Sequence, residues 1–395
     1  MVGRTLNEEG ERYKLNSRER FIKIAHFELQ DCVFQSSWFQ WYWHDTLERW
    51  VKEGASQEVL SNEHRGEYFR FERVEVMKIY SQIYGLGKSF GPPYVPPFIP
   101  LFKRKVLEED EETRTVIGES GVKYKEWKQQ PERMPQWLEY PVKNYEDWVE
   151  LKKRLDPHEP TRYPSWWEDK VRCWKDRDYA LGLPVGSFFG LLREFVGFEN
   201  LCTMYYDNPG LVHEMAEWME YFEIEIIKKI VKDVQIDYAM YWEDMAYKTG
   251  SLISPEFFRT FMTPHYKKVN DLLLSNGIDI ILVDSDGNTE ELIPLWIESG
   301  ITGHFPLEVT SGMDAVKLRK KYGKNFILIG NIDKRALAKG KEAIKEEVMN
   351  KVPFLISRGG YFPALDHFCP PDVSFKDYMY YLELLREIGG IKKGC

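Results

Sequence analysis

The sequence predicts an α/β protein built as a single (β/α)8 barrel domain over residues 1–395, with N-terminal additions. Short apolar runs alternate with long amphipathic stretches from residue 176 onward, which is typical of βα units around a parallel sheet. Acidic residues follow five consecutive apolar runs, as they do where barrel strands converge on an active site. The chain has 395 residues, which is enough for one large barrel with additions.

The second half of the chain, 176–395, supplies the regular repeats. Six strands are expected there, at 179–182, 238–241, 278–283, 302–305, 326–329 and 360–365. Five helices are expected between them, at 209–232, 255–276, 289–299, 314–322 and 340–358. Pro209 and Pro255 each follow a capping residue, which marks the first turn of a helix.

Residues 1–175 are expected to form an N-terminal extension, the first strand or strands, and lid elements. One or two strands from this part, around Val33 and Phe34 among others, would bring the count to eight, and the stretch 106–114 predicts a strand followed by a turn at 115–118. An open doubly wound sheet is the alternative architecture. The chain has no glycine-rich nucleotide loop, which weakens the nucleotide-binding version of that alternative.

Composition narrows the class of partner and the compartment. The net charge is −9 and there is no long basic block, which argues against nucleic acid or an anionic membrane as the main ligand. The five cysteines are scattered and odd in number, so a disulfide framework is not expected. No apolar run approaches the length of a membrane span. We therefore expect a soluble cytoplasmic protein, and the aromatic N-terminal part is compatible with a homodimer.

Candidate metal ligands follow the predicted strands. Glu243 follows the strand at 238–241, Asp284 and Asp286 follow the strand at 278–283, and His367 follows the last strand. Carboxylates with an imidazole suit a divalent metal ion. Any one of these acids could instead cap a helix or face solvent, and His367 alone could be a structural histidine. Five consecutive acidic strand ends favour a common site over five separate structural roles.

Other side chains near these strand ends allow two interpretations each, one functional and one structural. The chain is 15% aromatic, and Trp38, Phe39, Trp41 and Trp43 either wall a pocket for a flat ligand or pack in the core. Arg193 either pairs with a substrate carboxylate or forms a structural salt bridge. Cys369 is more readily explained as a buried thiol than as a ligand. Asp333 and Lys334 are expected to form an ion pair that braces the site or takes part in it.

Several segments together resemble the uroporphyrinogen decarboxylase-like superfamily. They are Ser17 to Phe21, Asp45 to Trp50, residues 135–147, Gly186 to Gly190, Trp242 to Asp244, Gly330 to Lys334, and Asp366-His367 with Pro370 to Asp372. The resemblance extends over nearly the whole chain and implies a (β/α)8 barrel. It also implies one of two activities: porphyrinogen decarboxylation, or zinc-dependent methyl transfer in partnership with a corrinoid protein.

The resemblance is nearer to the methyltransferases. True decarboxylases carry an arginine-rich N-terminal motif, and the corresponding residues 21–28 lack it. Methyltransferases with thiol acceptors carry His-x-Cys where this chain has Asp284, Ser285 and Asp286. The chain therefore resembles the substrate-side methyltransferases, which take a methyl group from a methoxylated aromatic or a similar donor. Decarboxylation of an unknown acid stays open as the alternative, and so does a non-catalytic corrinoid-binding module.

The resemblance also implies roles for the candidate residues. Zinc would be held by some of Glu243, Asp284, Asp286 and His367, and the three acids would be catalytic. The four aromatic residues and Arg193 would bind the substrate. The methyl group would pass to the cob(I)alamin of a partner protein, because this chain has no corrinoid-binding Asp-x-His-x-x-Gly motif.

Overall fold

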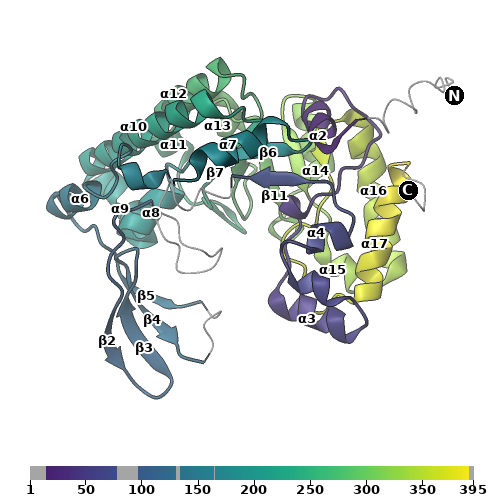
Figure 1. Cartoon of the computed structure of the whole chain (residues 1–395), viewed down its shortest axis with the longest axis horizontal. Helices are drawn as coiled ribbons and strands as arrows, with labels where there is room; N and C mark the ends of the chain where they lie inside the picture. Colours follow the sequence, from purple (N-terminus) through teal and green to yellow (C-terminus); the bar gives the residue numbers. More distant parts are fainter. Residues whose placement is uncertain (1–14, 78–96, 130–133, 164, 391–395) are drawn as a thin grey trace.

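A parallel sheet of seven strands forms the centre of the molecule, and helices cover its outer side (Figure 1). The computed structural model describes residues 15–77, 97–129, 134–163 and 165–390. In spatial order the strands are β1 (Val74–Val76), β6 (Ala180–Pro184), β7 (Tyr238–Trp242), β10 (Ile281–Asp284), β11 (Gly303–Leu307), β12 (Ile327–Gly330) and β13 (Tyr361–Phe362). All six neighbouring pairs are parallel, so the predicted α/β class and all six strands expected in 176–395 are confirmed.

Helices follow the strands, and each of the five segments expected to be helical in 176–395 contains helix. The helices are α2 (Ser17–Ala25), α3 (His44–Lys52), α4 (Arg65–Tyr68), α6 (Tyr145–Lys152), α7 (Trp167–Lys175), α8 (Gly190–Val196), α9 (Phe198–Asp207), α10 (Pro209–Asp233), α11 (Pro255–Phe261), α12 (Thr263–Ser275), α13 (Ile293–Glu298), α14 (Ala315–Tyr322), α15 (Lys334–Leu337), α16 (Lys341–Arg358) and α17 (Phe375–Ile388). The prediction of a single helix at 255–276 is wrong in one respect, because the segment forms two helices that are separated at Met262. Pro264 lies in the first turn of the second helix, where its missing N–H costs nothing.

The sheet curls so that the segment from Val33 to Trp43 lies between its two edges. On one side Ser36 forms a parallel bridge to Glu72, just before β1. On the other side Tyr42 forms a parallel bridge to Cys369, beyond β13. The curled seven-stranded sheet is compatible with a barrel, but the eighth strand expected around Val33 is reduced to these isolated bridges. A 3₁₀ turn at Ser37–Phe39 interrupts the segment, so a continuous ladder does not form.

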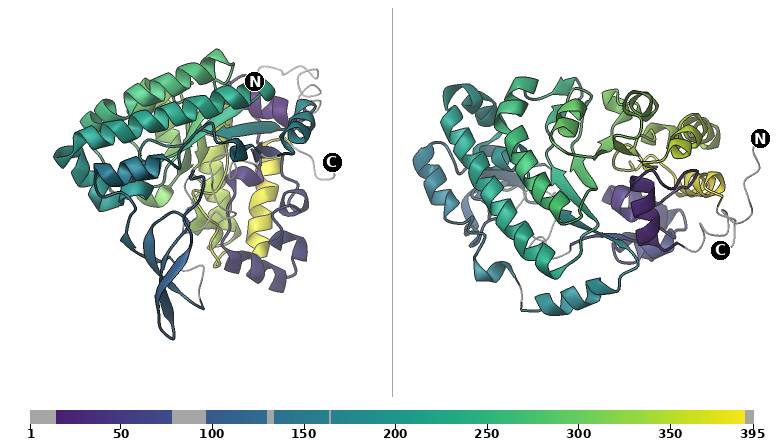
Figure 2. Two further views of the ribbon diagram at one scale, coloured as in Figure 1. Left: turned by 60° about the vertical axis from the view of Figure 1, so that its left-hand side comes forward. Right: turned by 90° about the horizontal axis from the view of Figure 1, so that it is seen from above.

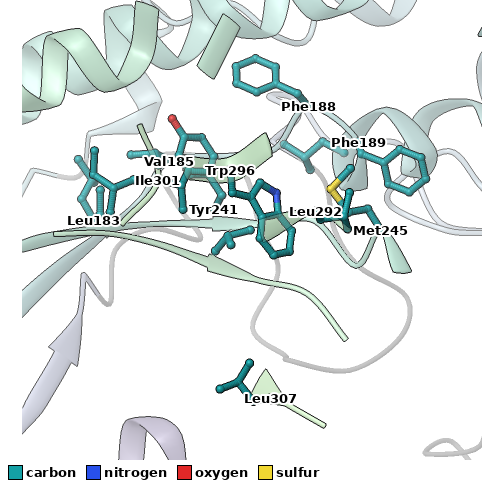
Figure 3. Close-up of a cluster of buried hydrophobic side chains, with 14 of the residues drawn as sticks. Leu183, Val185, Phe188, Phe189, Tyr241, Met245, Leu292, Trp296, Ile301 and Leu307 are labelled. Atoms are coloured by element: carbon teal, nitrogen blue, oxygen red, sulfur yellow. The ribbon is translucent and has the colours of Figure 1, made fainter. Parts of the chain in front are cut away.

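Side chains alternate between two cores along each strand, as the pleat requires. On β10, Leu282 points to an inner core that also holds Tyr238, Phe305 and Phe362. Val283 points instead to the layer between sheet and helices, which Figure 3 shows around Tyr241, Trp296 and Leu307. Asp284 follows Val283 at the end of β10 and therefore belongs to the inner face, at the carboxyl end of the sheet.

Helix α2 packs against the inner core. Its N-cap is Asn16, and a capping box with Glu19 fixes its start: the Glu19 N–H donates to Asn16 Oδ1 at 2.9 Å, and the Asn16 N–H donates to Glu19 Oε2 at 3.0 Å. Phe21 is fully buried, with its ring centre 5.1 Å from those of Tyr238 and Phe362. The interior of the curled sheet is therefore a packed core, and barrels of this kind carry their active sites at the carboxyl ends of the strands.

A separate antiparallel sheet projects from the body (Figures 1 and 2). It contains β2 (Lys105–Glu109), β3 (Thr113–Ile117), β4 (Lys123–Trp127) and β5 (Gln136–Glu139), and a short hairpin, β8 (Ala246–Tyr247) with β9 (Gly250–Ser251), follows β7. The turn expected at 115–118 is wrong, because most of it belongs to β3. The reversal comes earlier, where Asp110 accepts hydrogen bonds from the backbone of Glu112 and Thr113.

No helix within the described parts of the chain is both long and apolar enough to cross a bilayer.

Candidate active site

Three of the four predicted ligands lie together at the carboxyl end of the sheet. Asp284 ends β10, Asp286 lies two residues beyond, and His367 follows β13. The imidazole Nε2 of His367 is 3.3 Å from Asp286 Oδ1. Two groups of side chains have ligand atoms close enough to hold an ion, and Asp286 belongs to both.

The first group contains Asp286, Glu308 and His367, whose ligand atoms lie within 4.8 Å of one another. Glu308 comes directly after β11 and was not among the predicted ligands, although its place after a strand was the available signal. Its Oε2 accepts hydrogen bonds from the Gly287 N–H at 2.9 Å and from Ser311 Oγ at 3.1 Å. Those bonds fix the carboxylate, and in the described residues no hydrogen bond engages Oε1, which is therefore available to a ligand.

The second group contains Asp244, Asp284 and Asp286. Asp244 has a left-handed backbone with φ +44°, and its Oδ1 accepts a hydrogen bond from the Asp286 N–H at 3.3 Å. Burial and the nearby charge of Asp286 raise the pKa of Asp244 to about 6. Burial, together with Asp244 and Asp286, also raises the pKa of Asp284 well above its usual range. Like charges crowded in this way favour a bound cation or a shared proton.

The structure does not bring Glu243 to these groups. Its buried carboxylate accepts hydrogen bonds from five donors: Ser187 Oγ at 2.7 Å, the N–H groups of Phe188, Phe189 and Gly190 at 2.8–3.0 Å, and the Tyr266 hydroxyl. A carboxylate offers about four lone-pair sites, so little capacity is left for a metal ion. Glu243 instead joins the end of β7 to the first turn of α8.

His367 is surrounded by charge and aromatic rings. Burial opposes its protonation, but the hydrogen bond and charge of Asp286 prevail and raise the pKa of His367 above its usual value. The ring centre of Trp41 is 6.0 Å from that of His367, 6.1 Å from Phe305 and 5.9 Å from Phe368. Trp41 is thus the predicted aromatic residue nearest to the ligand group.

The other predicted aromatic residues take different positions. Phe39 is buried in the inner core, against Phe305 and Phe362. Trp38 is partly buried against that core, and Trp43 is 54% exposed and packs on Phe368. A shallow depression beside Trp41 is lined by Phe39, Trp41, Phe305, Pro306, Ile329, Gly330, Ala364 and Leu365. Its lining residues are apolar, but they pack so closely that no cavity the size of a water molecule is left between them.

Arg193 lies beside the second acidic group. Its Nη1 donates to the Asp244 carbonyl oxygen at 2.9 Å, and its guanidinium carbon is 5.2 Å from the Trp242 ring centre. Nε is also 3.6 Å from Glu194. These contacts hold the left-handed turn at Asp244 in place, and the prediction that Arg193 pairs with a substrate carboxylate stays a prediction.

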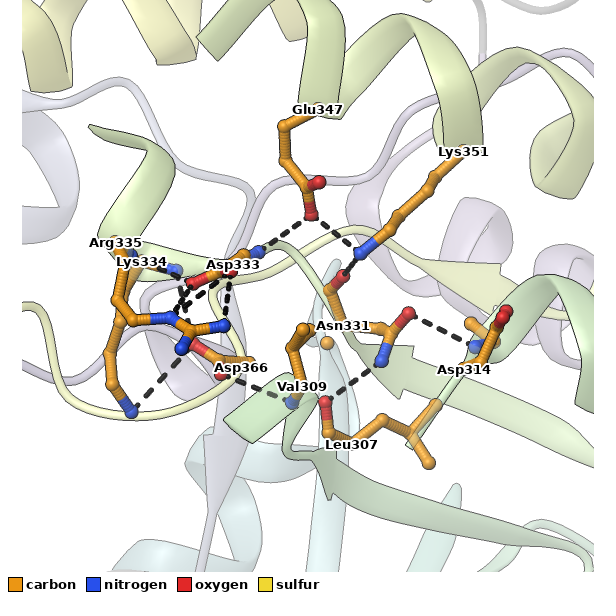
Figure 4. A network of polar contacts seen from close by, with 12 residues as sticks. Leu307, Val309, Asp314, Asn331, Asp333, Lys334, Arg335, Glu347, Lys351 and Asp366 are labelled. Carbon is orange, nitrogen blue, oxygen red and sulfur yellow. Dashed lines mark hydrogen bonds and ion pairs between the residues drawn. The ribbon is translucent and has the colours of Figure 1, made fainter. Parts of the chain in front are cut away.

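A network of buried polar groups joins the loops after β11, β12 and β13 (Figure 4). Asp366 is fully buried and accepts hydrogen bonds from the N–H groups of Val309 and Lys334, both at 3.1 Å. The ion pair expected between Asp333 and Lys334 is wrong. Asp333 pairs with Arg335 at 2.7 Å, and Lys334 faces Asp366 at 3.7 Å.

Cys369 belongs to neither candidate group, in agreement with the buried-thiol reading. It is fully buried, and burial raises the pKa of its thiol well above the usual range, so the thiolate that binds metals is disfavoured. Its backbone N–H donates to the Trp41 carbonyl at 2.8 Å, and its own carbonyl accepts from Thr46 Oγ1 at 2.8 Å. The role of Cys369 is thus to hold the segment that carries Trp41.

The donors of the first group fit a divalent metal ion. Two carboxylates and one imidazole are an oxygen and nitrogen set of the kind found in catalytic zinc sites, which use three protein ligands and leave a position open. Such a set also accepts other divalent ions. His367 already lies against Asp286, so one carboxylate holds the imidazole near the other donors.

Comparisons with known proteins agree with this fold. A family model described as "Uroporphyrinogen decarboxylase (URO-D)" matches residues 126–388. No curated protein matches the chain. Among solved structures, the chain is similar to a methyltransferase from Methanosarcina mazei, with a TM-score of 0.57, 13% sequence identity, and coverage of 94% of this chain and 99% of that one. At this identity the similarity concerns the fold alone.

Proposed function

The chain belongs to the uroporphyrinogen decarboxylase family, and from this premise we propose that it is a methyltransferase. The methyl donor is a methoxylated aromatic or a similar small molecule, and the acceptor is the cob(I)alamin of a separate corrinoid protein. The main support for the proposal is that Asp286, Glu308 and His367 lie close together at the carboxyl ends of the strands, beside Trp41. The methyltransferase from Methanosarcina mazei shows that a similar fold can host an enzyme of the proposed class.

The ligand set in this proposal is Asp286, Glu308 and His367, with zinc as the ion. Compared with the set expected from the sequence, Asp286 and His367 are kept, Glu308 is added, and Glu243 is removed. Asp284 lies in the neighbouring group and is kept as a catalytic candidate. A zinc ion held there would stabilise negative charge that develops on the leaving oxygen of the donor.

The chemistry is a displacement at the methyl carbon. The carbon–oxygen bond of the methyl ether breaks and its electron pair stays on the oxygen, so a phenolate leaves. The low-valent cobalt of the partner supplies the electron pair for the new bond to carbon. The protein contributes orientation, because the two reactants must meet in line. Trp41, beside His367, would contact the ring, while the bonds of Glu308 to Gly287 and Ser311 hold a ligand in place.

Decarboxylation is the second candidate, and the description of the matching family favours it. Crowded carboxylates such as Asp244 and Asp284 could exchange a proton with a substrate, because the pKa of each is raised. Such an enzyme would release carbon dioxide and would have no need of a corrinoid acceptor. The two candidates therefore differ in both product and acceptor.

Metal content tests the ligand assignment. We expect about one zinc per chain in the wild-type protein by elemental analysis, and a large loss in His367→Ala and in Glu308→Gln, because each removes one of three protein ligands. Asp286→Asn should lose zinc as well. The matched control is Glu243→Gln, which alters an acid at a neighbouring strand end whose oxygens are already occupied.

The control variant separates the two ligand sets. Glu243→Gln should keep its zinc while unfolding at a lower temperature, since a side-chain amide cannot accept all five hydrogen bonds. Zinc lost from Glu243→Gln but retained in Glu308→Gln would contradict the assignment. A wild-type protein that binds no metal after incubation with zinc would favour decarboxylation.

A further inference from the structure

Strand β2 forms a free edge of the antiparallel sheet that projects from the body (Figures 1 and 2). The strand order in that sheet is β2-β3-β4-β5, so β3 pairs with one side of β2, and within the described parts of the chain no strand pairs with its other side. All residues from 103 to 112 are exposed, including Val106 at 42% and Leu107 at 38%. An exposed edge strand carries unpaired backbone N–H and C=O groups that can pair with another chain.

Positive and negative charges are segregated along this exposed segment. Three basic residues precede the two apolar residues and five acidic residues follow them, in the order Lys103-Arg104-Lys105-Val106-Leu107-Glu108-Glu109-Asp110-Glu111-Glu112. This order is self-complementary when two copies run antiparallel, because the basic end of each copy then faces the acidic end of the other. A parallel arrangement would place like charges opposite one another. The order of charges therefore fits an antiparallel second copy of the same segment.

Two-fold symmetry determines which residues lie opposite one another. With Leu107 on the axis, each basic residue faces an acidic residue of the second copy: Lys103 faces Glu111, Arg104 faces Asp110, and Lys105 faces Glu109. The axis makes each of these three pairs occur twice. An axis at Val106 or at Glu108 leaves two such pairs in place of three. The register centred on Leu107 is therefore the one that the charges favour.

Several of these charges are available to another chain. Arg104 and Glu109 already form ion pairs within their own sheet, at 2.5 Å and 2.6 Å. In the described part of the chain no ion pair engages Lys103, Lys105 or Glu111, and all three side chains are exposed. A second copy would thus supply opposite charges to residues that have none nearby.

A bulge at the centre of β2 limits how much backbone pairing it can add. Val106 lies opposite Val116 and Glu108 lies opposite Thr115, so Leu107 is the extra residue between them. Bulges twist an edge strand and shorten the ladder that it can form with another chain. The attraction between two copies therefore depends mainly on side-chain charges, which salt screens.

We propose that β2 is a self-association surface, and that two copies of this chain dimerise by antiparallel pairing of their 103–112 segments. The interface is isologous, since both copies use the same surface. It is small and its ion pairs are exposed, so the dimer is weak and sensitive to salt. This inference is independent of the proposed function, because it concerns how the protein assembles and involves none of the residues of the candidate site.

Sedimentation velocity of the full-length protein tests the association. The wild type should shift from monomer to dimer as its concentration rises at low salt. Its dimer dissociation constant should rise about 10-fold or more at high salt, because the charges of the two segments are then screened.

Two double variants each reverse one end of the segment. Lys103→Glu with Lys105→Glu reverses the basic end, and Glu109→Lys with Glu111→Lys reverses the acidic end. Either variant alone places like charges opposite one another, so its dissociation constant should rise about 10-fold or more. An equimolar mixture of the two should associate as tightly as the wild type, because every substituted position then faces an opposite charge.

The matched control is Lys339→Glu with Lys345→Glu, which makes the same change in net charge at two exposed lysines far from the sheet in sequence. This variant should dimerise as the wild type does. Circular dichroism of each variant checks that it is folded, as expected for substitutions at exposed positions.

Three outcomes contradict the inference. A wild type that stays monomeric at every concentration in low salt is the first, and the edge would then serve a different protein or none. A dimer that both reversed variants keep with unchanged affinity is the second, because the two copies then meet through another surface. The third is a mixture of the folded variants that associates no better than either variant alone.

Discussion

His304 is a buried neutral histidine, and its partners decide which nitrogen carries the proton. Its Nδ1 lies 3.1 Å from the Val283 carbonyl, which can only accept, so this nitrogen carries the hydrogen. Its Nε2 then accepts from Thr289 Oγ1 at 2.9 Å, and the ring packs on Trp296. Burial lowers the pKa of His304 to about 4. This histidine is outside the predicted ligand set, and the structure assigns it to the layer between sheet and helices.

The low pKa of His304 makes stability depend on pH. The ordinary histidine pKa is about 6.5. Between about pH 6.5 and 4, His304 is therefore protonated in the unfolded state but stays neutral in the folded state. This contribution is therefore complete above about pH 6.5 and is lost as the pH falls towards 4. The free energy of unfolding in urea should fall by roughly 2 kcal/mol more between pH 7 and pH 5 in wild type than in His304→Gln. The same pH slope in both proteins would contradict this account of His304.

Carboxylates show where prediction from sequence stops at the residue scale. Asp286 and His367 were both predicted as ligands because they follow strands, and the structure brings them together with Glu308. Glu243 has the same kind of position, yet it accepts five hydrogen bonds from the turn before α8 and from Tyr266 on α12. Glu308 was not predicted as a metal ligand, although its carboxylate lies beside His367. Which donors surround a carboxylate depends on loops that are distant in sequence, and no local pattern reports them.

At the scale of elements, periodicity predicted the repeats well. Helix α10 begins at Pro209 and ends one residue beyond the predicted limit, because the Asn208 cap and the first-turn proline are local signals. The antiparallel sheet was found only in part, since every residue of its outer strand β2 is exposed and the apolar cluster that it buries, around Val116 and Tyr124, is small. A strand was expected around Val33 and Phe34, but a 3₁₀ turn at Ser37–Phe39 and isolated long-range bridges decide the form of this segment.

Packing inside the curled sheet requires a glycine in β11. A methyl group at Gly303 would lie 2.7 Å from both Leu282 Cδ2 and Ile327 Cβ, two side chains of the inner core. Gly303→Ala should therefore destabilise the protein by about 1–3 kcal/mol in urea unfolding. Gly210→Ala is the matched control, because no atom lies within 4 Å of the added methyl group in α10 and the change should be neutral or slightly stabilising. Equal stability of the two variants would contradict the packing described for the inner core.

At the scale of the whole molecule, the curled sheet keeps the residues that stabilise the fold apart from the residues of the candidate site. Phe21 of α2 fills the inner core among Tyr238 and Phe362, while the acids and His367 lie at the carboxyl ends of the strands. Asp366 ties the loops that follow neighbouring strands through the backbone of Val309 and Lys334. The family resemblance, the α/β class and the strand ends were available from sequence. Which side chains form the metal-ligand group at the carboxyl ends of the strands depends on how these loops pack against one another.

Methyl transfer itself is the most direct test of the central claim. The measurement is the change in the visible absorbance of cob(I)alamin under anaerobic conditions, with 4-methoxybenzoate as donor and the zinc-treated protein as catalyst. We predict that cob(I)alamin is consumed with formation of an equal amount of 4-hydroxybenzoate, and that chelation of zinc or the Glu308→Gln substitution abolishes the reaction. Unchanged cob(I)alamin together with release of carbon dioxide from the acid would contradict the claim and identify a decarboxylase.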